Sequence, residues 1–135
     1  MAELDESTIA RLVPYTRTLG MHFPVIGPEL VEARLEVSRE LSTIGGGLHG
    51  GAILSLADAA AAVLATVVHD DGAMPATTES SAHFLEPVTG SATARAVPLR
   101  VGRRTVVVQI EVFDSTDVRC AVVTQTVARI PAPRA

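Results

Sequence analysis

The segment from His49 to Val68 limits what this chain can fold into more than any other stretch. After Gly51 it contains neither proline nor glycine, and alanine and leucine, both strong helix formers, dominate it. Its apolar residues lie all round the predicted helix, which is typical of a helix that is covered on most sides. Asp58 is the one ionisable residue between His49 and His69. The fold must therefore bury a long helix that carries a single carboxylate.

Strand-like patterns flank this helix on both sides. From Val31 to Val37, apolar residues alternate with mostly charged ones, which predicts a half-buried strand. A short helix capped by Ser7 or Thr8 is expected before Pro14. Because an antiparallel sheet must bury its apolar face, the long helix is its natural partner. We predict a single α+β domain over residues 1–135, with two strands, the central helix and a four-stranded meander forming a sheet wrapped around that helix. The other strands are expected at residues 19–26, 76–85, 91–101, 105–113 and 118–130.

The composition argues against several classes of function. The net charge is −4, all eleven basic residues are arginine and only 3% of residues are aromatic, so the chain lacks the residues for binding nucleic acid. Cys120 cannot form an intrachain disulfide and lies in an apolar run, which favours a buried structural thiol. The histidines have no short metal-ligand spacing, so we expect no metal; they are His22, His49, His69 and His83.

Two segments bear on the cellular location. The first six residues are acidic and lack the apolar run of a signal peptide. The apolar stretch 52–68 is mostly alanine and carries Asp58, so we expect it to be too short and too weakly hydrophobic to span a bilayer. We therefore predict a cytoplasmic protein without a membrane partner.

Residues 43–58, TIGGGLHGGAILSLAD, resemble the signature of the hotdog-fold acyl-CoA thioesterases. The resemblance is greatest to the phenylacetic-acid-pathway (PaaI-like) branch of the 4-hydroxybenzoyl-CoA thioesterase superfamily. The shared pattern is Leu-His-Gly-Gly followed by Leu-Ala-Asp, with Asp58 nine residues after His49. The resemblance covers about residues 17–130. It implies a hotdog fold, hydrolysis of an acyl-CoA to the free acid and CoA without a further cofactor, and an active site at a dimer interface.

The residues themselves also indicate a site. A carboxylate on an apolar helix is costly to bury unless it is partnered, neutral or functional, and a nucleophile or general base with reduced solvation is one such use for Asp58. The N–H groups of Gly50 and Gly51 lie at the predicted start of the helix, where they have no intrahelical partner. They also lie at the positive end of the helix dipole, which suits a developing oxyanion.

Helix geometry decides how these groups can meet. Gly51 and Asp58 are two turns apart on one face, which separates them by about 10 Å along the axis. A single thioester carbonyl cannot contact both. If two such helices pack antiparallel about a two-fold axis, Gly51 of one subunit faces Asp58 of the other. We therefore expect a composite site in a homodimer, or in a homotetramer made of two such dimers.

The resemblance implies roles for individual residues. Asp58 would be the nucleophile or the base that activates water, the Gly51 N–H would polarise the thioester carbonyl, and His49 would orient the loop or position the carbonyl. Thr77, with Thr78 as the neighbouring alternative, falls where related enzymes have a serine that helps hold the water or the acid.

Thr43 stands where the family often has asparagine, and a hydroxyl lacks the amide donor of that residue. Arg103 and Arg104 lie in a predicted hairpin turn and resemble the basic pair that contacts CoA phosphates in related proteins.

Other interpretations of these residues stay open. His49 could simply cap the helix, and the Arg103–Arg104 pair could be a solvated hairpin tip. The sequence 22–24, His-Phe-Pro, is similar to a motif of hotdog dehydratases, but it lies in the first predicted strand and we assign it to sheet packing. We interpret Glu79 and His83 as polar residues on a strand face, about 13 Å apart. The main alternative function is a non-catalytic acyl-CoA-binding or regulatory hotdog domain.

Overall fold

A computed structural model describes residues 4–132 of the chain. Its elements, in chain order, are helices α1 (Glu6–Leu12) and α2 (Pro14–Leu19), strands β1 (His22–Ile26) and β2 (Val31–Glu36), the 3-10 turn η1 (Arg39–Leu41), helix α3 (Gly50–Val67), and strands β3 (Met74–Phe84), β4 (Ser91–Val101), β5 (Thr105–Asp114) and β6 (Arg119–Ile130).

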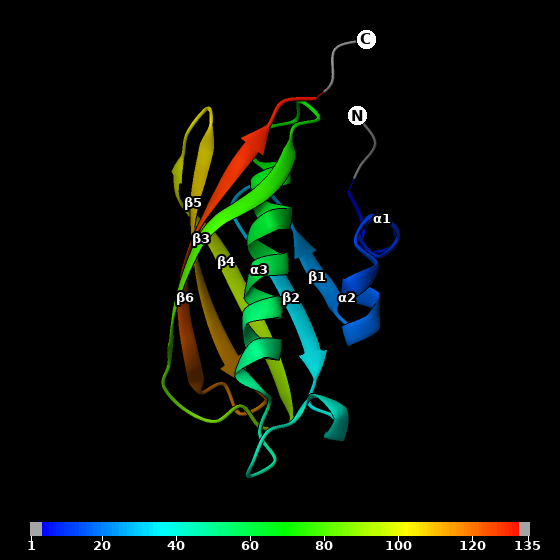
Figure 1. Ribbon diagram of the computed structural model, residues 1–135, viewed down its shortest axis with the longest axis vertical. Coiled ribbons are helices and arrows are strands. Elements are labelled where there is room, and N and C mark those ends of the chain that lie inside the picture. Colours follow the sequence, from blue (N-terminus) through cyan, green and yellow to red (C-terminus); the bar gives the residue numbers. More distant parts are fainter. Residues whose placement is uncertain (1–3, 133–135) are drawn as a thin grey trace.

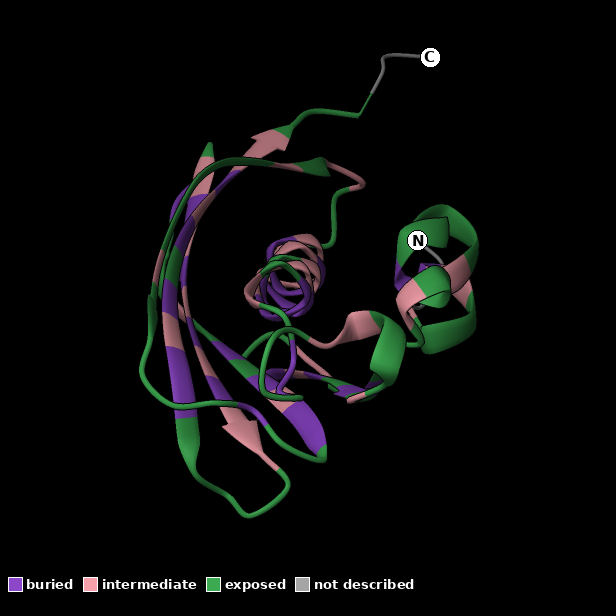
Figure 2. Ribbon diagram, turned by 60° about the horizontal axis from the view of Figure 1, so that its bottom comes forward, coloured by how far each residue is buried: buried purple, intermediate pink, exposed green. Residues whose placement is uncertain are grey.

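The strands form one sheet with the order β1-β2-β4-β5-β6-β3, and every neighbouring pair is antiparallel. The sheet curves around one side of α3, while α1 and α2 stand on the other side of that helix (Figures 1 and 2). Alternate residues of the inner strands point at α3 and are fully buried, as with Val106, Val108, Ile110 and Val112 of β5. This arrangement confirms the expected hotdog fold.

Strand β3 does not occupy the position that the sequence predicted. A four-stranded meander would pair it with β4, but it pairs with β6 at the edge of the sheet, and β4 pairs with β2. The exposure of β3 explains this difference, because all of its residues except the half-buried Ala76 and Ala82 are exposed. A strand without a continuous buried face is suited to an edge rather than to the interior of the sheet.

The N-terminal region also differs from the prediction. Asp5, rather than Ser7 or Thr8, caps α1, because its carboxylate accepts a hydrogen bond from the Thr8 N–H at 2.8 Å. Residues 14–19 form a second helix, α2, which the sequence analysis did not predict; Pro14 at a first helical position favours a helix that begins there. Leu19, expected to begin a strand, is the last residue of this helix. Strand β1 therefore begins only at His22.

Helix α3 is the centre of the core, but it is not covered all round. Its sheet-facing side is fully buried, whereas the opposite side is half-buried or exposed (Figure 2). By length and composition alone α3 could cross a membrane, so the expectation that it is too short and too weakly hydrophobic was wrong. Half of the helix is buried within the fold. The buried side is formed by Ile53, Leu56, Ala57, Ala60, Ala61 and Leu64.

Candidate active site

Asp58 lies in the middle of α3, where its exposed side chain reaches the edge of the sheet at β3 and β6. Its Oδ1 accepts two hydrogen bonds, from Thr77 Oγ1 at 2.7 Å and from Gln125 Nε2 at 2.6 Å. Gln125 Nε2 also lies 3.1 Å from Thr77 Oγ1, so the three side chains form a closed triangle. Within residues 4–132, Oδ2 has no hydrogen-bond partner. The arrangement fixes one oxygen of Asp58 and leaves the other for chemistry.

Gln125 is the part of this triangle that the sequence analysis missed. It lies on β6 with only 1% of its surface exposed. A detectable signal was present, since Gln125 is the polar residue between Val123 and Val127 on the buried face of an otherwise alternating strand. Its Oε1 is buried and has no hydrogen-bond partner in the described part of the chain. A buried amide oxygen without a partner calls for an explanation, and the contact of the same amide with Asp58 makes Gln125 a candidate positioning residue.

Of the two threonines considered for this position, the structure brings only Thr77 to Asp58. The hydroxyl of Thr78 donates instead to the carbonyl of Thr126 at 3.3 Å. The register between β3 and β6 shifts between Thr77 and Glu79, so the neighbours Thr77 and Thr78 have different hydrogen-bond partners. Glu79 and His83 are exposed on the edge strand.

His49 caps the N-terminus of α3. Its Nδ1 accepts a hydrogen bond from the Gly51 N–H at 2.8 Å, so the capping interpretation is confirmed. An Nδ1 that accepts implies that the neutral ring carries its proton on Nε2, which leaves an exposed N–H donor. A Cβ on residue 51 would lie 3.1 Å from that Nδ1, so glycine permits this close cap.

The same hydrogen bond changes which backbone N–H group is the candidate donor to the thioester carbonyl. The Gly51 N–H, which the sequence predicted to polarise the thioester, is already bonded to His49. Among residues 4–132 the Gly50 N–H has no acceptor, because the first residue of α3 lies ahead of its hydrogen-bonded turns. The structure therefore moves the candidate donor one residue back, to Gly50.

Asp58 and Gly50 line two different cavities of the same chain. One cavity, of about 430 Å³, lies at the start of α3 and is lined by Thr43, Gly50 and Phe84, among others. The other, of about 550 Å³, includes Asp58 and lies between α3 and the N-terminal helices. Eight residues of helix separate Gly50 from Asp58 by about 12 Å. Thr43 therefore lines the same cavity as Gly50, and within one chain neither residue lies near Asp58.

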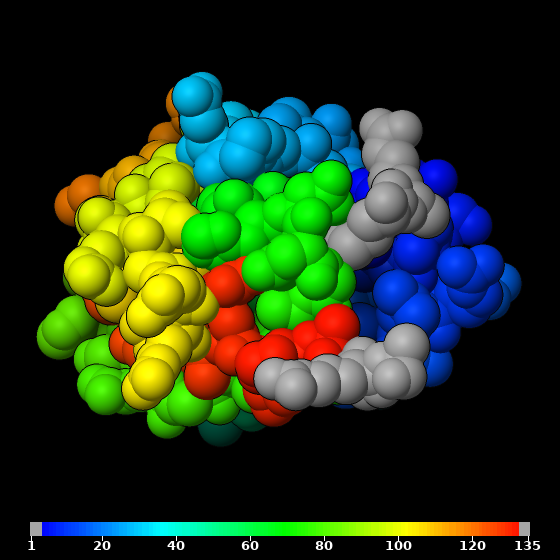
Figure 3. Space-filling model, turned by 90° about the horizontal axis from the view of Figure 1, so that it is seen from above, coloured from blue at the N-terminus to red at the C-terminus, as the bar shows by residue number. Residues whose placement is uncertain are grey.

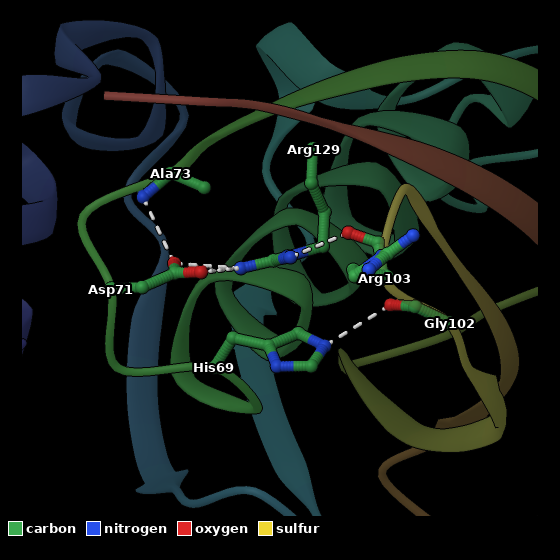
Figure 4. Close-up of polar contacts among 6 residues, drawn as sticks. All are labelled: His69, Asp71, Ala73, Gly102, Arg103 and Arg129. Atoms are coloured by element: carbon green, nitrogen blue, oxygen red, sulfur yellow. Dashed lines mark hydrogen bonds and ion pairs between the residues drawn. The ribbon is translucent and has the colours of Figure 1, made fainter. Parts of the chain in front are cut away.

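Arg103 and Arg104 lie at the tip of the β4–β5 hairpin with exposed side chains. Arg129 anchors the hairpin: its Nη1 donates to the Arg103 carbonyl at 2.7 Å, and its Nη2 binds the Asp71 carboxylate (Figure 4). The Arg129 guanidinium lowers the pKa of Asp71 by hydrogen bonding. His69 Nε2 also lies 3.1 Å from the Gly102 carbonyl.

These contacts fix the hairpin next to the end of α3. Seen from that end of the molecule, the hairpin (yellow) lies beside the residues that follow α3 (green) and the end of β6 (red) (Figure 3). The backbone carbonyls of the tip are used for anchoring. The tip therefore holds two arginine side chains at a defined place on the surface.

The family model of the thioesterase superfamily matches residues 45–121. These residues include α3, β3, β4 and β5 and end near the start of β6. The chain belongs to the thioesterase superfamily. The thioesterase HI1161 of Haemophilus influenzae has a crystal structure that is similar with a TM-score of 0.87, at 26% identity over 96% of this chain and 93% of that one.

Two further proteins are similar to this chain. The proofreading thioesterase EntH of Cronobacter turicensis is 29% identical over 118 residues, which is 87% of this chain and 84% of the relative. The crystal structure of AziG from S. sahachiroi is similar with a TM-score of 0.83, at 26% identity, and covers 90% of this chain and all of that one. This superfamily member is thus a thioester hydrolase with a hotdog fold.

Proposed function

We propose that this thioesterase hydrolyses acyl-CoA to the free acid and CoA, and that Asp58 is its catalytic carboxylate. The observation that carries the proposal is the half-bonded carboxylate: Thr77 and Gln125 hold Oδ1 while Oδ2 has no partner within residues 4–132. The Leu-His-Gly-Gly sequence and the nine-residue spacing from His49 to Asp58 support a place near the PaaI-like branch.

In the proposed mechanism, Oδ2 of Asp58 either attacks the thioester carbon directly or takes a proton from the water that attacks it. Negative charge develops on the carbonyl oxygen, and the Gly50 N–H at the positive end of α3 donates to it. The exposed Nε2–H of His49 helps to position that oxygen. The carbon–sulfur bond breaks, water supplies the new acid oxygen, and the thiol of CoA leaves with a proton.

The site is proposed to be shared between two copies of the chain. The 12 Å between Gly50 and Asp58 is too long for one carbonyl, and antiparallel packing of two α3 helices would bring each pair together across a two-fold axis. Two further features support this packing: β3 is an exposed edge strand, and Asp58 itself is exposed on α3. A dimer or a tetramer of two such dimers satisfies this geometry.

We also propose that the side chains of Arg103 and Arg104 bind the phosphates of CoA. Both are exposed on an anchored hairpin tip, and guanidinium groups are suited to phosphate. We expect the reaction to need no metal or cofactor and the protein to work in the cytoplasm.

Replacing Asp58 tests the catalytic assignment. Asp58→Asn keeps the acceptor for Thr77 but removes the charge, so thiol release from an acyl-CoA panel should fall nearly to background while oligomer size is unchanged. Equal turnover by the variant and the wild-type protein would remove Asp58 from the mechanism, and the non-catalytic acyl-CoA-binding alternative predicts binding without turnover by both.

A pair of substitutions at Gly50 tests the carbonyl donor. Gly50→Pro removes only the free N–H, because proline is tolerated at the first helical position and His49 already has the extended backbone that must precede it. Gly50→Ala is the matched control, since it keeps the N–H and its Cβ would meet only Phe84 at 3.6 Å. We expect the proline variant alone to lose activity.

Mixing Asp58→Asn chains with Gly50→Pro chains tests the shared site. Each mixed dimer regains one complete site of two, and half of the randomly paired dimers are mixed, so roughly a quarter of wild-type activity should return. Absence of any recovery in verified mixed dimers would contradict a site built from two chains.

A further inference from the structure

The cavity between α3 and the N-terminal helices, here called the N-terminal cavity, has a volume of about 550 Å³. Its wall on α3 is a single stripe at helical spacing, and the opposite wall comes from α1, α2 and the turn that leads into β3. Figure 1 shows α1 and α2 beside α3 on the side away from the β4–β5 hairpin. The stripe consists of Ser55, Asp58, Ala59, Ala62, Val63 and Thr66.

The polar side chains in this wall are almost all satisfied within the chain. Ser55 Oγ donates to the Gly51 carbonyl at 2.8 Å, so the Tyr15 hydroxyl, 3.0 Å away, must donate to Ser55. Thr66 and Thr16 donate to backbone carbonyls of their own helices or caps, each at 2.8 Å. The remaining side chains of the wall are apolar, apart from Asp58. The side chains that line the cavity are therefore apolar or already hydrogen-bonded, apart from the carboxylate of Asp58.

We propose that the N-terminal cavity binds the acyl group of the substrate, and that this group is a straight aliphatic chain of medium length. The inference rests on the proposed thioester hydrolysis at Asp58. A ligand that fits these walls has an apolar body, because the hydrogen-bonding groups are already used, and a reactive polar end at Asp58. The acyl part of a thioester has this polarity, with the carbonyl at one end.

The length of the stripe sets the size of the chain. Asp58 and Thr66 are eight residues apart, about 12 Å along the helix axis. An extended chain of single bonds advances about 1.2 Å per bond, taken from the rise of an extended backbone, so about ten carbons reach from a carbonyl at Asp58 along the stripe to Thr66. Helices α1 and α2 supply the wall opposite α3, and Leu12 and Tyr15 are its large side chains that remain more than half exposed. The N-terminal helices thus determine which acyl chains are accepted.

The experiment measures kcat/KM for straight acyl-CoA substrates from four to sixteen carbons. The wild-type protein should prefer eight to ten carbons. Ala62→Phe fills the cavity and should lower kcat/KM for the ten-carbon substrate at least tenfold relative to the four-carbon one. Leu12→Ala widens it and should move the preference to longer chains. Leu99→Ala is the matched control, because Leu99 is similarly exposed but lies on β4 outside both cavities.

The outcomes separate this inference from the proposed function. If the wild-type protein hydrolyses acyl-CoA but neither Ala62→Phe nor Leu12→Ala changes the length profile, the acyl group binds elsewhere and the inference is overturned. If no acyl-CoA is hydrolysed, the proposed function fails, and binding of decanoate by calorimetry then decides the inference. Decanoate binding that Ala62→Phe weakens at least tenfold, and Leu99→Ala leaves unchanged, supports the cavity; binding that ignores Ala62→Phe, or no binding, overturns it.

Discussion

Replacing Gln125 with leucine should separate activity from stability in this thioesterase. Gln125 donates to Asp58 Oδ1 at 2.6 Å, and a hydrogen bond to a charged group contributes about 1.5–3 kcal/mol. We expect the variant to lose this contribution in the transition state of the reaction at Asp58. Since about 1.4 kcal/mol of activation free energy corresponds to a tenfold change in rate, kcat should fall roughly ten- to hundred-fold. Because Gln125 is buried behind Asp58 and acts only as a positioning residue, KM should stay unchanged.

The same substitution should not destabilise the fold. Gln125 Oε1 is buried without a partner in the described residues, and such an acceptor costs about 1–3 kcal/mol, which leucine removes. Asp58 is exposed and keeps its hydrogen bond from Thr77, so no charge is left buried and unpaired. The melting temperature of Gln125→Leu should therefore equal or exceed that of the wild-type protein.

Thiol release and thermal unfolding, measured on the same samples, test both expectations. Gln109→Leu is the matched control, because Gln109 is half-buried on the face of β5 that points away from α3. A lower melting temperature with unchanged kcat would assign Gln125 a structural role only and refute the reasoning. A rise in KM with unchanged kcat would refute the positioning role as well.

Three further outcomes follow from the structure. Replacing both Arg103 and Arg104 with alanine should raise KM for acyl-CoA about tenfold or more and leave kcat unchanged. KM for the same acyl group on a short thiol, which has no CoA phosphates, should not change. An equal effect on both substrates would argue against phosphate contact. The Phe23 N–H lowers the pKa of Glu6 below its ordinary value of 4.5, so stability from this contact is complete above pH 4.5 and is lost as the pH falls through the lowered pKa. The protection factor of the Phe23 amide, which is its intrinsic exchange rate at each pH divided by the observed rate, should fall in that acid range, and Glu6→Gln should lose this dependence. Cys120 is fully buried and burial raises the pKa of its thiol, so it should react with a thiol reagent only after unfolding; rapid reaction of the native protein would contradict this.

Local patterns were enough to predict most of the elements. The helix from Gly50 to Val67 follows from an uninterrupted run of helix formers after a glycine-rich segment, and strands β2 and β5 follow from period-two alternation. The spacing from His49 to Asp58 and the free N–H groups at a helix start were likewise readable, because both are properties of one helix. The cap by His49 then moved the candidate donor from Gly51 to Gly50, a change of one residue that depends on a side-chain rotamer.

What the sequence determined by itself about this protein is therefore the central helix with its single carboxylate, the strands around it, and the signature of its superfamily. Only the tertiary structure decided that β3 lies at the sheet edge beside β6, because alternation reports which face of a strand is buried but not which strand lies next to it. Only the fold brought Gln125 to Asp58 across 67 residues, and only the packing of α1 and α2 closed a cavity next to that carboxylate. These contacts join segments far apart in the chain, so no local pattern encodes them.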